Sequence, residues 1–334
     1  MTTYVLYSPD GAIDEFFNSN TTVTRQQCDE FAISHAGGVS TALQMQGVCS
    51  YTVAAGPKKS KVFQFRDENS TIDMGKISLA KAIHPEFVAS CKYLGTMGNS
   101  RPIYIYEMEH LPGTAHIMAR IPPDDMSRQH NTIKDFARFF AQSWNNDLRP
   151  GSDATTTLLI EFQSSFDLLA RNLPSRFAPN LERVHKELPS IFLKALPFVL
   201  SHGDLNEMNI LVDPNSGNIT GIVDWAESRI LPFGFALHGL ENFLGRMDSE
   251  GWHYYDRYGE LERLFWQTFR KEAHNFSDTD FYLIRAARMA GIFYRYGFKF
   301  DTKGVVQSVR MDQPDDSLAY LDAFCAADEW APLA

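Results

Sequence analysis

The chain has 334 residues, of which 44% are hydrophobic and 13% aromatic, and this is the composition of an ordinary globular protein. Its length predicts about two domains or lobes and leaves ample material for a core. The formal net charge of −10 disfavours a general affinity for nucleic acid or for an anionic membrane, because either partner would be repelled at long range.

The sequence also lacks the features of a secreted or membrane protein. The four cysteines, at positions 28, 49, 91 and 325, form no C-x-x-C pair and no metal-ligand spacing. The first residues lack a basic region followed by a long apolar stretch, and no window approaches the roughly 20 apolar residues of a membrane span. We therefore expect free thiols, a cytoplasmic location and no membrane partner.

Helix and strand signals alternate over the first third of the chain. A capping box over Thr24 to Gln27 predicts the start of a helix, and Gly37 predicts its end. Segments with alternating hydrophobicity predict strands. The predicted elements are a helix over 25–36, strands over 48–53 and 61–66, a helix over 72–83, and a strand over 103–106 that leads to Pro112-Gly113.

Beyond residue 113 the hydrophobic period becomes helical. Ile133, Phe136, Phe140 and Trp144 lie on one face at 3.6-residue spacing, which predicts a core helix. Further helices are predicted over 155–172, 235–245, 254–272 and 280–296.

The last of these helices carries a row of basic side chains. We interpret this row as a solvated face, because long basic side chains usually extend into water. It comprises Arg285, Arg288, Arg295 and Lys299.

The segment from 202 to 225 has the residue types of a phosphoryl-transfer site. It reads His202-Gly203-Asp204, then Asn209, and a further carboxylate, Asp224, follows after two short apolar runs. A kinase needs a carboxylate at the acceptor hydroxyl, followed by an amide oxygen and a second carboxylate that hold Mg²⁺ on the nucleotide phosphates. Asp204, Asn209 and Asp224 supply these groups in that order.

The spacing of these residues has a geometric explanation. Residues 210–212 and 219–223 are β-prone, and the turn-rich segment between them predicts a hairpin. A hairpin brings its open ends together, so Asn209 and Asp224 would lie side by side. The alternative is a polar turn between buried strands, which requires three functional residue types and a hairpin to coincide by chance.

With these residues the chain resembles the aminoglycoside phosphotransferase and choline kinase group of small-molecule kinases. The signature of that group is H-G-D-x-x-x-x-N with a later Asp between apolar residues and Trp or Phe. The resemblance implies that Asp204 is the catalytic aspartate, that Asn209 and Asp224 are Mg²⁺ ligands, and that His202 is a structural member of the loop.

The resemblance also implies nucleotide contacts in the first part of the chain. Arg66, which closes the second predicted strand, would pair with the α- and β-phosphates, or would be a solvated arginine at a strand end. Backbone groups near Glu107, Met108 and Glu109 would contact adenine. The alternative for this segment is an ordinary strand that ends in a Pro-Gly turn.

The sequence departs from the group in two respects. The helix over 72–83 should supply a glutamate that holds the basic residue, but Gly75 and Lys76 stand where the acid is expected, and the nearest carboxylate is Asp73. There is also no G-x-G-x-x-G loop. These departures leave open an alternative function, a repurposed or inactive kinase-fold protein that binds a nucleotide or metabolite without phosphoryl transfer.

Acidic residues bear on the acceptor. Glu227 and Glu241 are the nearest acids in sequence to the acceptor side of Asp204, which favours a cationic or polyhydroxylated acceptor. The alternative is that both are solvated charges at helix ends.

The predicted fold is α+β and two-lobed, like that of protein kinases. Residues 1–106 would form the small β-rich lobe, 107–113 the hinge, and 114–334 the larger helical lobe. The predicted function is ATP- and Mg²⁺-dependent phosphorylation of a hydroxyl group on a small molecule, with no nucleic-acid partner.

Overall fold

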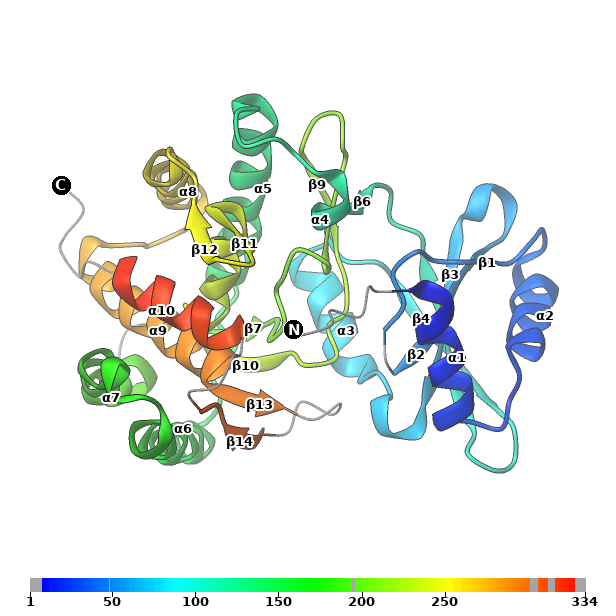
Figure 1. Cartoon of the computed structure of the whole chain (residues 1–334), viewed down its shortest axis with the longest axis horizontal. Coiled ribbons are helices and arrows are strands. Elements are labelled where there is room, and N and C mark those ends of the chain that lie inside the picture. The colour runs from blue at the N-terminus through cyan, green and yellow to red at the C-terminus, as the bar shows by residue number, and fades with distance from the viewer. Residues whose placement is uncertain (1–7, 48, 194–195, 301–305, 312–315, 328–334) are drawn as a thin grey trace. The chain divides into compact units, whose positions relative to one another are not determined.

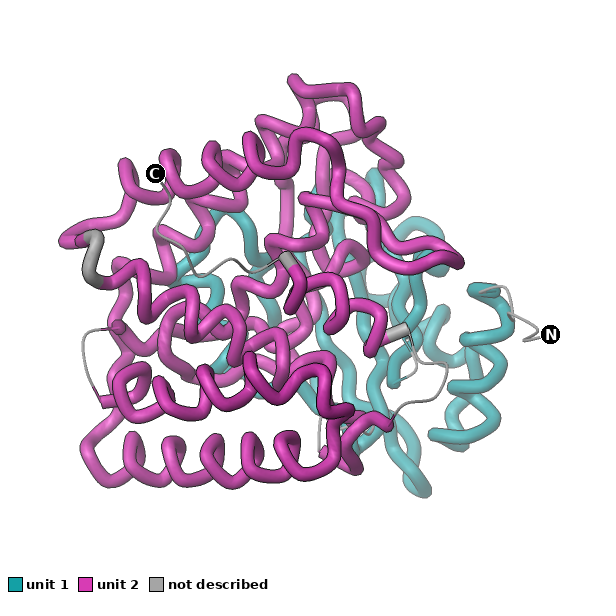
Figure 2. The backbone as a smooth tube through the Cα atoms, turned by 60° about the vertical axis from the view of Figure 1, so that its left-hand side comes forward, with its two compact units in different colours: residues 1–112 teal, residues 113–334 magenta. Residues whose placement is uncertain are grey.

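The structure is a computed structural model that describes residues 8–47, 49–193, 196–300, 306–311 and 316–327. The chain divides into two units, Met1–Pro112 (unit 1) and Gly113–Ala334 (unit 2), which Figure 2 colours separately. Unit 1 is built around a sheet and unit 2 mainly from helices. The α+β fold with a β-rich part and a larger helical part is therefore confirmed.

Unit 1 has a five-stranded sheet in the order β1-β2-β3-β5-β4, in which every neighbouring pair is antiparallel (Figure 1). The predicted strands appear as β2, β3 and β5. The elements are α1 (Pro9–Ser19), α2 (Arg25–Ala36), β1 (Thr41–Ala42), β2 (Ser50–Ala55), β3 (Lys61–Asp67), α3 (Met74–Ile83), β4 (Cys91–Met97) and β5 (Ile103–Glu109).

Local signals explain where the helices of unit 1 begin and end. The capping box is present, because the Thr24 hydroxyl accepts a hydrogen bond from the Gln27 backbone and the Gln27 side chain accepts one from the Thr24 backbone. Gly37, at φ +77°, ends α2. Ile13, Phe16 and Ala32 on α1 and α2 belong to one core cluster with apolar residues of β2, β3 and β5.

Among its described residues, unit 2 contains the longer helices and four small antiparallel sheets. The sheets pair β6-β8-β9, β7-β10, β11-β12 and β13-β14. The helices are α4 (His116–Ala119), α5 (Met126–Trp144), α6 (Ser152–Asn172), α7 (Ala178–Leu193), the 3₁₀ helix η4 (Phe235–Phe243), α8 (Tyr258–Glu272), α9 (Asp278–Gly297) and α10 (Asp316–Ala327). The strands are β6 (Thr114–Ala115), β7 (Phe198–Ser201), β8 (Ile210–Val212), β9 (Ile219–Ile222), β10 (Arg229–Pro232), β11 (Gly245–Asp248), β12 (Gly251–Tyr254), β13 (Phe298–Phe300) and β14 (Val306–Val309).

Two predicted helices of unit 2 differ from the structure. The segment predicted as a helix from Tyr254 begins four residues later, because Tyr254 ends the hairpin β11-β12. The turn of that hairpin needs Gly251, at φ +124°, and the Asp248 carboxylate accepts a hydrogen bond from the Glu250 backbone. The predicted helix over 235–245 is a 3₁₀ helix that ends at Phe243.

Aromatic rings pack α5 against its neighbours in unit 2. The ring of Phe136 contacts those of Phe140 at 5.0 Å and of Phe243 in η4 at 4.8 Å, both edge to face. Phe140 in turn contacts Phe265 of α8 at 5.9 Å. The apolar face read from the sequence is therefore the face that fixes α5 in the core.

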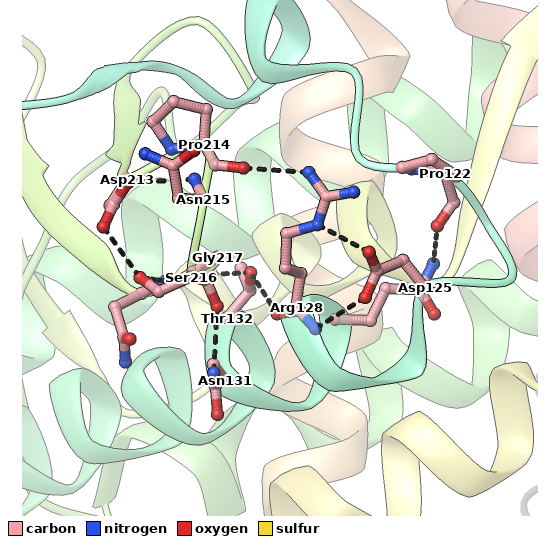
Figure 3. A network of polar contacts seen from close by, with 12 residues as sticks. Pro122, Asp125, Arg128, Asn131, Thr132, Asp213, Pro214, Asn215, Ser216 and Gly217 are labelled. Atoms are coloured by element: carbon pink, nitrogen blue, oxygen red, sulfur yellow. Dashed lines mark hydrogen bonds and ion pairs between the residues drawn. The ribbon is translucent and has the colours of Figure 1, made fainter.

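Helix α5 also makes polar contacts. Side chains in its first turns hydrogen-bond to the turn between β8 and β9 (Figure 3). Arg128 donates to the carbonyl of Pro214 at 2.8 Å, and Asn131 donates to that of Ser216 at 2.9 Å. The Thr132 hydroxyl donates to the carbonyl of Gly217.

Asp135 continues this contact one turn later on α5. Its Oδ2 accepts hydrogen bonds from the Asn218 side chain at 2.8 Å and from the Ile219 backbone at 3.0 Å. Asp135 is only 7% exposed, so losing it would leave a buried backbone N–H unpaired. Helix α5 thus fixes the closed end of the hairpin whose open ends carry Asn209 and Asp224.

Among the residues that the structure describes, no helix is both long and apolar enough to cross a membrane. Cys28, which is buried, and Cys91, which is half-buried, are free thiols.

Replacing Gly217 with alanine should destabilise unit 2. Gly217 has φ +75°, and a Cβ there would lie 2.3 Å from the carbonyl oxygen of Arg128, a backbone atom of α5. We expect a loss of about 1–3 kcal/mol in the free energy of unfolding, measured by urea denaturation. Gly259→Ala is the control, because its Cβ would meet nothing closer than 3.7 Å. Equal stability of the two variants would contradict the proposed contact.

Candidate active site

The loop between β7 and β8, residues 202–209, is called the catalytic loop here. It follows the fully buried strand β7 and turns sharply at Gly203, which has φ +82°. A Cβ at Gly203 would lie 2.6 Å from the carbonyl oxygen of Glu227, so no other residue fits without moving the backbone. This close approach brings the loop against the segment that follows Asp224.

His202 ties the catalytic loop to the end of β9. Its Nε2 lies 2.8 Å from the carbonyl oxygen of Val223, which can only accept, so Nε2 carries the proton. Its ring packs edge to face on Trp225 at 4.7 Å. Burial lowers the pKa of His202, so the ring stays neutral and acts as a packing and hydrogen-bonding group.

Asn209 closes the catalytic loop on Asp204. Its Nδ2 donates to the Asp204 carbonyl oxygen at 2.8 Å and to Oδ2 of the carboxylate at 3.1 Å. Both oxygens can only accept, so the amide NH₂ must face Asp204 and the amide oxygen of Asn209 faces the other way. Asn206 donates to Oδ1 of the same carboxylate at 2.8 Å.

Arg295, in the last turn of α9, forms an ion pair with Asp204 that the sequence did not predict. One terminal nitrogen, Nη2, contacts Oδ1 of Asp204, and Nη1 lies 3.8 Å from Oε2 of Glu227. Burial alone would raise the pKa of Asp204, but the charge of Arg295, with smaller help from the Asn206 hydrogen bond, lowers it overall. Asp204 is therefore held as a carboxylate.

The hydrogen bonds of Asp204 leave one acceptor position open. A carboxylate has about four lone-pair sites, two on each oxygen. Oδ1 accepts from Asn206 and Arg295, and Oδ2 accepts from Asn209. The remaining site is on Oδ2, which is the oxygen that a substrate hydroxyl would reach.

The structure places Asn209 and Asp224 next to each other, at the open ends of the hairpin. The backbone N–H of Val223 donates to the carbonyl oxygen of Asn209 at 2.9 Å, one residue before Asp224. Asp224 is exposed and has φ +62°, a left-handed conformation that is uncommon outside glycine.

The donor set at this place fits Mg²⁺. Mg²⁺ prefers oxygen ligands and usually takes one or two from the protein, with water and substrate phosphates completing its shell. The amide oxygen of Asn209 and the carboxylate of Asp224 are oxygen groups of this type. Within the described ranges no group of three His, Cys, Asp or Glu could hold a metal ion.

Glu227 lies near Asp204 and is not an isolated charge. Arg295 lies between the two carboxylates. Burial, and next the charge of Asp204, raise the pKa of Glu227, although its side chain is 40% exposed.

Glu241 is part of a buried ion-pair network. It is 3% exposed; its Oε1 accepts from Arg288 and its Oε2 from the Tyr254 hydroxyl at 3.0 Å. Arg288 also donates to Glu262 at 2.6 Å. The alternative of a solvated helix-end charge is therefore wrong for Glu241, and the solvated face predicted for the basic row is wrong at Arg288 and Arg295. A cavity of about 40 Å³ adjoins this network, lined by Tyr254, Glu262, Arg285, Arg288 and Phe324 among others.

His238 of η4 is a second buried histidine near the catalytic loop. Its Nδ1 donates to the Phe235 carbonyl oxygen at 3.0 Å, while its Nε2 has no partner among the described residues. Burial lowers the pKa of His238 to about 4. Nearby, Asn242 donates to the carbonyl oxygen of Leu205 at 3.0 Å, so η4 supports the catalytic loop directly.

In unit 1, Arg66 is buried and not a solvated strand end. It is 6% exposed, its Nε donates to the carbonyl of Ser70, and its Nη1 donates to Gln64 at 3.2 Å. Asp73 caps α3 by accepting from the backbone of Gly75 and Lys76. Its carboxylate is thus used at the helix end.

The predicted adenine-binding segment is the end of strand β5. Glu107 is 8% exposed and pairs with Lys61 at 2.8 Å and with His35 at 3.2 Å; its hydrogen bond from Lys61 lowers its pKa. Met108 pairs with Cys91 across the sheet, and the backbone N–H of Glu109 donates to Ser90 at 3.1 Å. The sheet therefore engages much of this backbone.

Comparison with known families bears on the site. Residues 79–240 match the model of the phosphotransferase enzyme family, a segment just under half of the chain that contains Asp204, Asn209 and Asp224. The resemblance read from the motif is therefore confirmed for this segment. A search of curated proteins found no match.

Solved structures with some similarity include an aminoglycoside phosphotransferase from Streptomyces rimosus and a choline kinase from Cryptosporidium parvum. The first has a TM-score of 0.47 at 12% identity, covering 80% of this chain and 98% of that chain. The second has a TM-score of 0.49 at 9% identity, covering 82% of this chain and 87% of that chain. Both TM-scores are below 0.5, so the resemblance depends on the match over residues 79–240 and on the motif.

The burial of His238 should make stability depend on pH. With a pKa of about 4 when folded and about 6.5 when unfolded, this ring takes up a proton on unfolding between those pH values. The free energy of unfolding therefore falls as the pH is lowered from 6.5 to 4, by up to about 1.4 kcal/mol per pH unit. In His238→Asn this part of the slope should disappear.

The measurement is urea denaturation at several pH values between 4 and 7. Asparagine keeps a donor for the Phe235 carbonyl oxygen but does not titrate. His274→Asn, at an exposed position, is the control and should behave as wild type. A slope in His238→Asn as steep as in wild type would contradict the assignment.

Proposed function

We propose that this chain is an ATP- and Mg²⁺-dependent phosphotransferase that phosphorylates a hydroxyl group of a small molecule. The observation that carries the proposal is the arrangement at Asp204, an ionised carboxylate with one open acceptor position on Oδ2. Asn209, bonded to that carboxylate, and Asp224, at the adjoining hairpin end, supply the metal-ligand types. The phosphotransferase family match over residues 79–240 supports the same reaction class.

Asp204 would accept a hydrogen bond from the acceptor hydroxyl and orient its oxygen toward the phosphoryl group. Phosphoryl transfer passes through a loose transition state, so the protein contributes mainly position and charge. The lowered pKa of Asp204 keeps it unprotonated at neutral pH, as this role requires. The hydroxyl proton would pass to Asp204 late in the transfer.

Asn209 and Asp224 would hold Mg²⁺ through the amide oxygen and the carboxylate. When bound, the metal ion neutralises charge on the nucleotide phosphates. The protein's own contribution is orientation, because the amide NH₂ of Asn209 is committed to Asp204 and its oxygen is left for the metal.

The nucleotide contacts of unit 1 stay predictions. They comprise phosphate binding by Arg66, adenine binding by the backbone of Glu107, Met108 and Glu109, and a hinge over 107–113 between lobes at 1–106 and 114–334. Buried Arg66 is held near the end of β3 by Gln64 and Ser70, so its place in the sheet is fixed.

On the acceptor side, the charges favour a polyhydroxylated acceptor over a strongly cationic one. Both oxygens of Glu241 are engaged by Arg288 and Tyr254, so this carboxylate offers little to a cation. Glu227 shares Arg295 with Asp204. Of the two acids proposed to bind the acceptor, Glu227 is therefore the one we keep.

The alternative, a kinase-fold protein that binds a nucleotide or metabolite without phosphoryl transfer, has one specific observation in its favour. The first turn of α3 supplies no glutamate, and Asp73 is used as its cap. The proposed function consumes ATP and the alternative does not, so a measurement of ATP turnover decides between them.

Asp224→Asn should remove the Mg²⁺-dependent part of ATP binding and leave the fold intact. The lost charge is that of a proposed metal ligand, and Asp224 is exposed, so stability should change little. Calorimetric titration with ATP, with and without Mg²⁺, measures the effect. Asp153→Asn, an exposed aspartate on α6, is the control. Full Mg²⁺ enhancement in Asp224→Asn would remove the metal assignment.

Asp204→Asn should abolish turnover and retain ATP binding. We expect a loss of about 10²–10⁴-fold in the rate of ATP consumption, which is the usual size of a general-base contribution. The rate is measured as Mg²⁺-ATP consumption against a panel of amino-alcohol, sugar and phenolic acceptors, with water as the acceptor in the blank. If the variant consumes ATP at the wild-type rate, Asp204 does not have this role. If wild type binds Mg²⁺-ATP but consumes none with any acceptor, the binding-only alternative holds.

A further inference from the structure

Arg295 is the cation at the catalytic carboxylate. It lies on the last turn of α9, 91 residues from Asp204 in sequence, and its side chain is 28% exposed. The catalytic loop and the segment from Ile222 to Ser228 contain no lysine or arginine of their own. Their charged residues are Asp204, Glu207, Asp224 and Glu227, all acidic. Within these two segments a phosphoryl group would therefore meet only acidic charges.

The hydrogen-bond donors of Arg295 are mostly unused. A guanidinium has five N–H groups in a planar fork. Within the described part of the chain, Arg295 makes one hydrogen bond, to Oδ1 of Asp204, and one ion pair with Glu227 at 3.8 Å, which is too long for a hydrogen bond. Four N–H groups are therefore left for a ligand.

The position of these donors relative to the reaction follows from Asp204. The acceptor hydroxyl would bind at Oδ2, roughly 2.6–3.2 Å away, since Oδ1 is filled. Arg295 already touches Oδ1, on the same carboxylate group. The phosphoryl group must reach that hydroxyl oxygen, so its equatorial oxygens come within reach of a guanidinium fork on Asp204.

We propose that Arg295 is a catalytic residue whose unused N–H groups bind the oxygens of the phosphoryl group while it is transferred. This rests on the proposed function. In the step, the bond from the acceptor oxygen to phosphorus forms and the bond from phosphorus to the β–γ bridging oxygen breaks. The hydroxyl proton goes to Asp204, and the products are a phosphate ester and ADP. Arg295 offsets negative charge on the moving group, as arginine side chains do in other phosphoryl-transfer enzymes.

The competing role is that Arg295 only holds Asp204 in place. The two roles differ in what the guanidinium touches during the reaction. A residue that only holds Asp204 contributes equally whether or not a phosphoryl-like group is bound. A residue that binds the phosphoryl oxygens contributes to binding of a transition-state mimic and not to binding of ADP.

The test compares binding of Mg²⁺-ADP with binding of Mg²⁺-ADP plus aluminium fluoride, a planar mimic of the moving phosphoryl group. Calorimetry gives both affinities for wild type, Arg295→Gln, Arg295→Lys and Arg176→Gln. Arg176 is the matched control, because it pairs with a carboxylate, Asp322 of α10, away from the catalytic loop. No acceptor is needed.

In wild type we expect aluminium fluoride to tighten ADP binding by about tenfold or more. Arg295→Gln should lose most of this gain while its affinity for Mg²⁺-ADP changes by less than about threefold. Arg295→Lys should keep part of the gain, since it retains the charge and loses the fork. Arg176→Gln should keep all of it.

The proposal is overturned if Arg295→Gln keeps the full gain, or if wild type binds Mg²⁺-ADP and shows no gain. Should Arg295→Gln not fold, Arg295→Lys decides, and a full gain there overturns the proposal. Failure of the proposed function is distinguishable, because wild type would then either not bind Mg²⁺-ADP or consume no Mg²⁺-ATP with any acceptor of the panel.

Discussion

The side-chain amide of Asn209 holds the catalytic loop closed, and the rest of the site depends on this contact. By donating to both the backbone and the carboxylate of Asp204, it fixes one end of the loop to the other. Asn209 directly precedes β8, so the loop takes its position from the hairpin β8-β9. The turn of that hairpin is in turn held by α5. Helix α5 thus helps to fix the positions of Asp204 and Asn209, although it carries neither residue.

Helix α9 supplies the positive charge that this acidic site lacks. Arg288 and Arg295 are seven residues apart, two helical turns, and so lie on one face. One closes a buried network with Glu241 and Glu262, and the other contacts Asp204. A buried charge is tolerable only when it is paired, which explains why each arginine meets carboxylates from a different segment. On this face of α9, Arg288 therefore stabilises the packing of unit 2, and Arg295 contacts the carboxylate of Asp204.

Local spacing in the sequence predicted the hairpin and the neighbouring ends at Asn209 and Asp224, because a hairpin and a short loop are determined by nearby residues. It also predicted the capping box at Thr24. It did not predict the partners of Arg288 and Arg295, which lie 47 and 91 residues away and meet only after the helices pack. The row of basic residues could be read from the sequence. Its periodicity predicts that these residues share one face of α9 but does not predict what that face contacts. The turn signal at Asp248 to Gly251 was present in the sequence and would have moved the start of α8.

Unit 2 keeps several energetically unfavourable features near the catalytic loop. Asp224 holds a left-handed backbone at φ +62°, and the buried ring nitrogens Nδ1 of His202 and Nε2 of His238 have no partner among the described residues. Each costs about 1–3 kcal/mol, a large share of a typical net stability. A carboxylate held at a fixed position beside Asn209 would serve binding of a metal–nucleotide complex as well as transfer. The ion-paired carboxylate of Asp204, which faces neither phosphate nor adenine in the proposed site, is the feature that favours transfer.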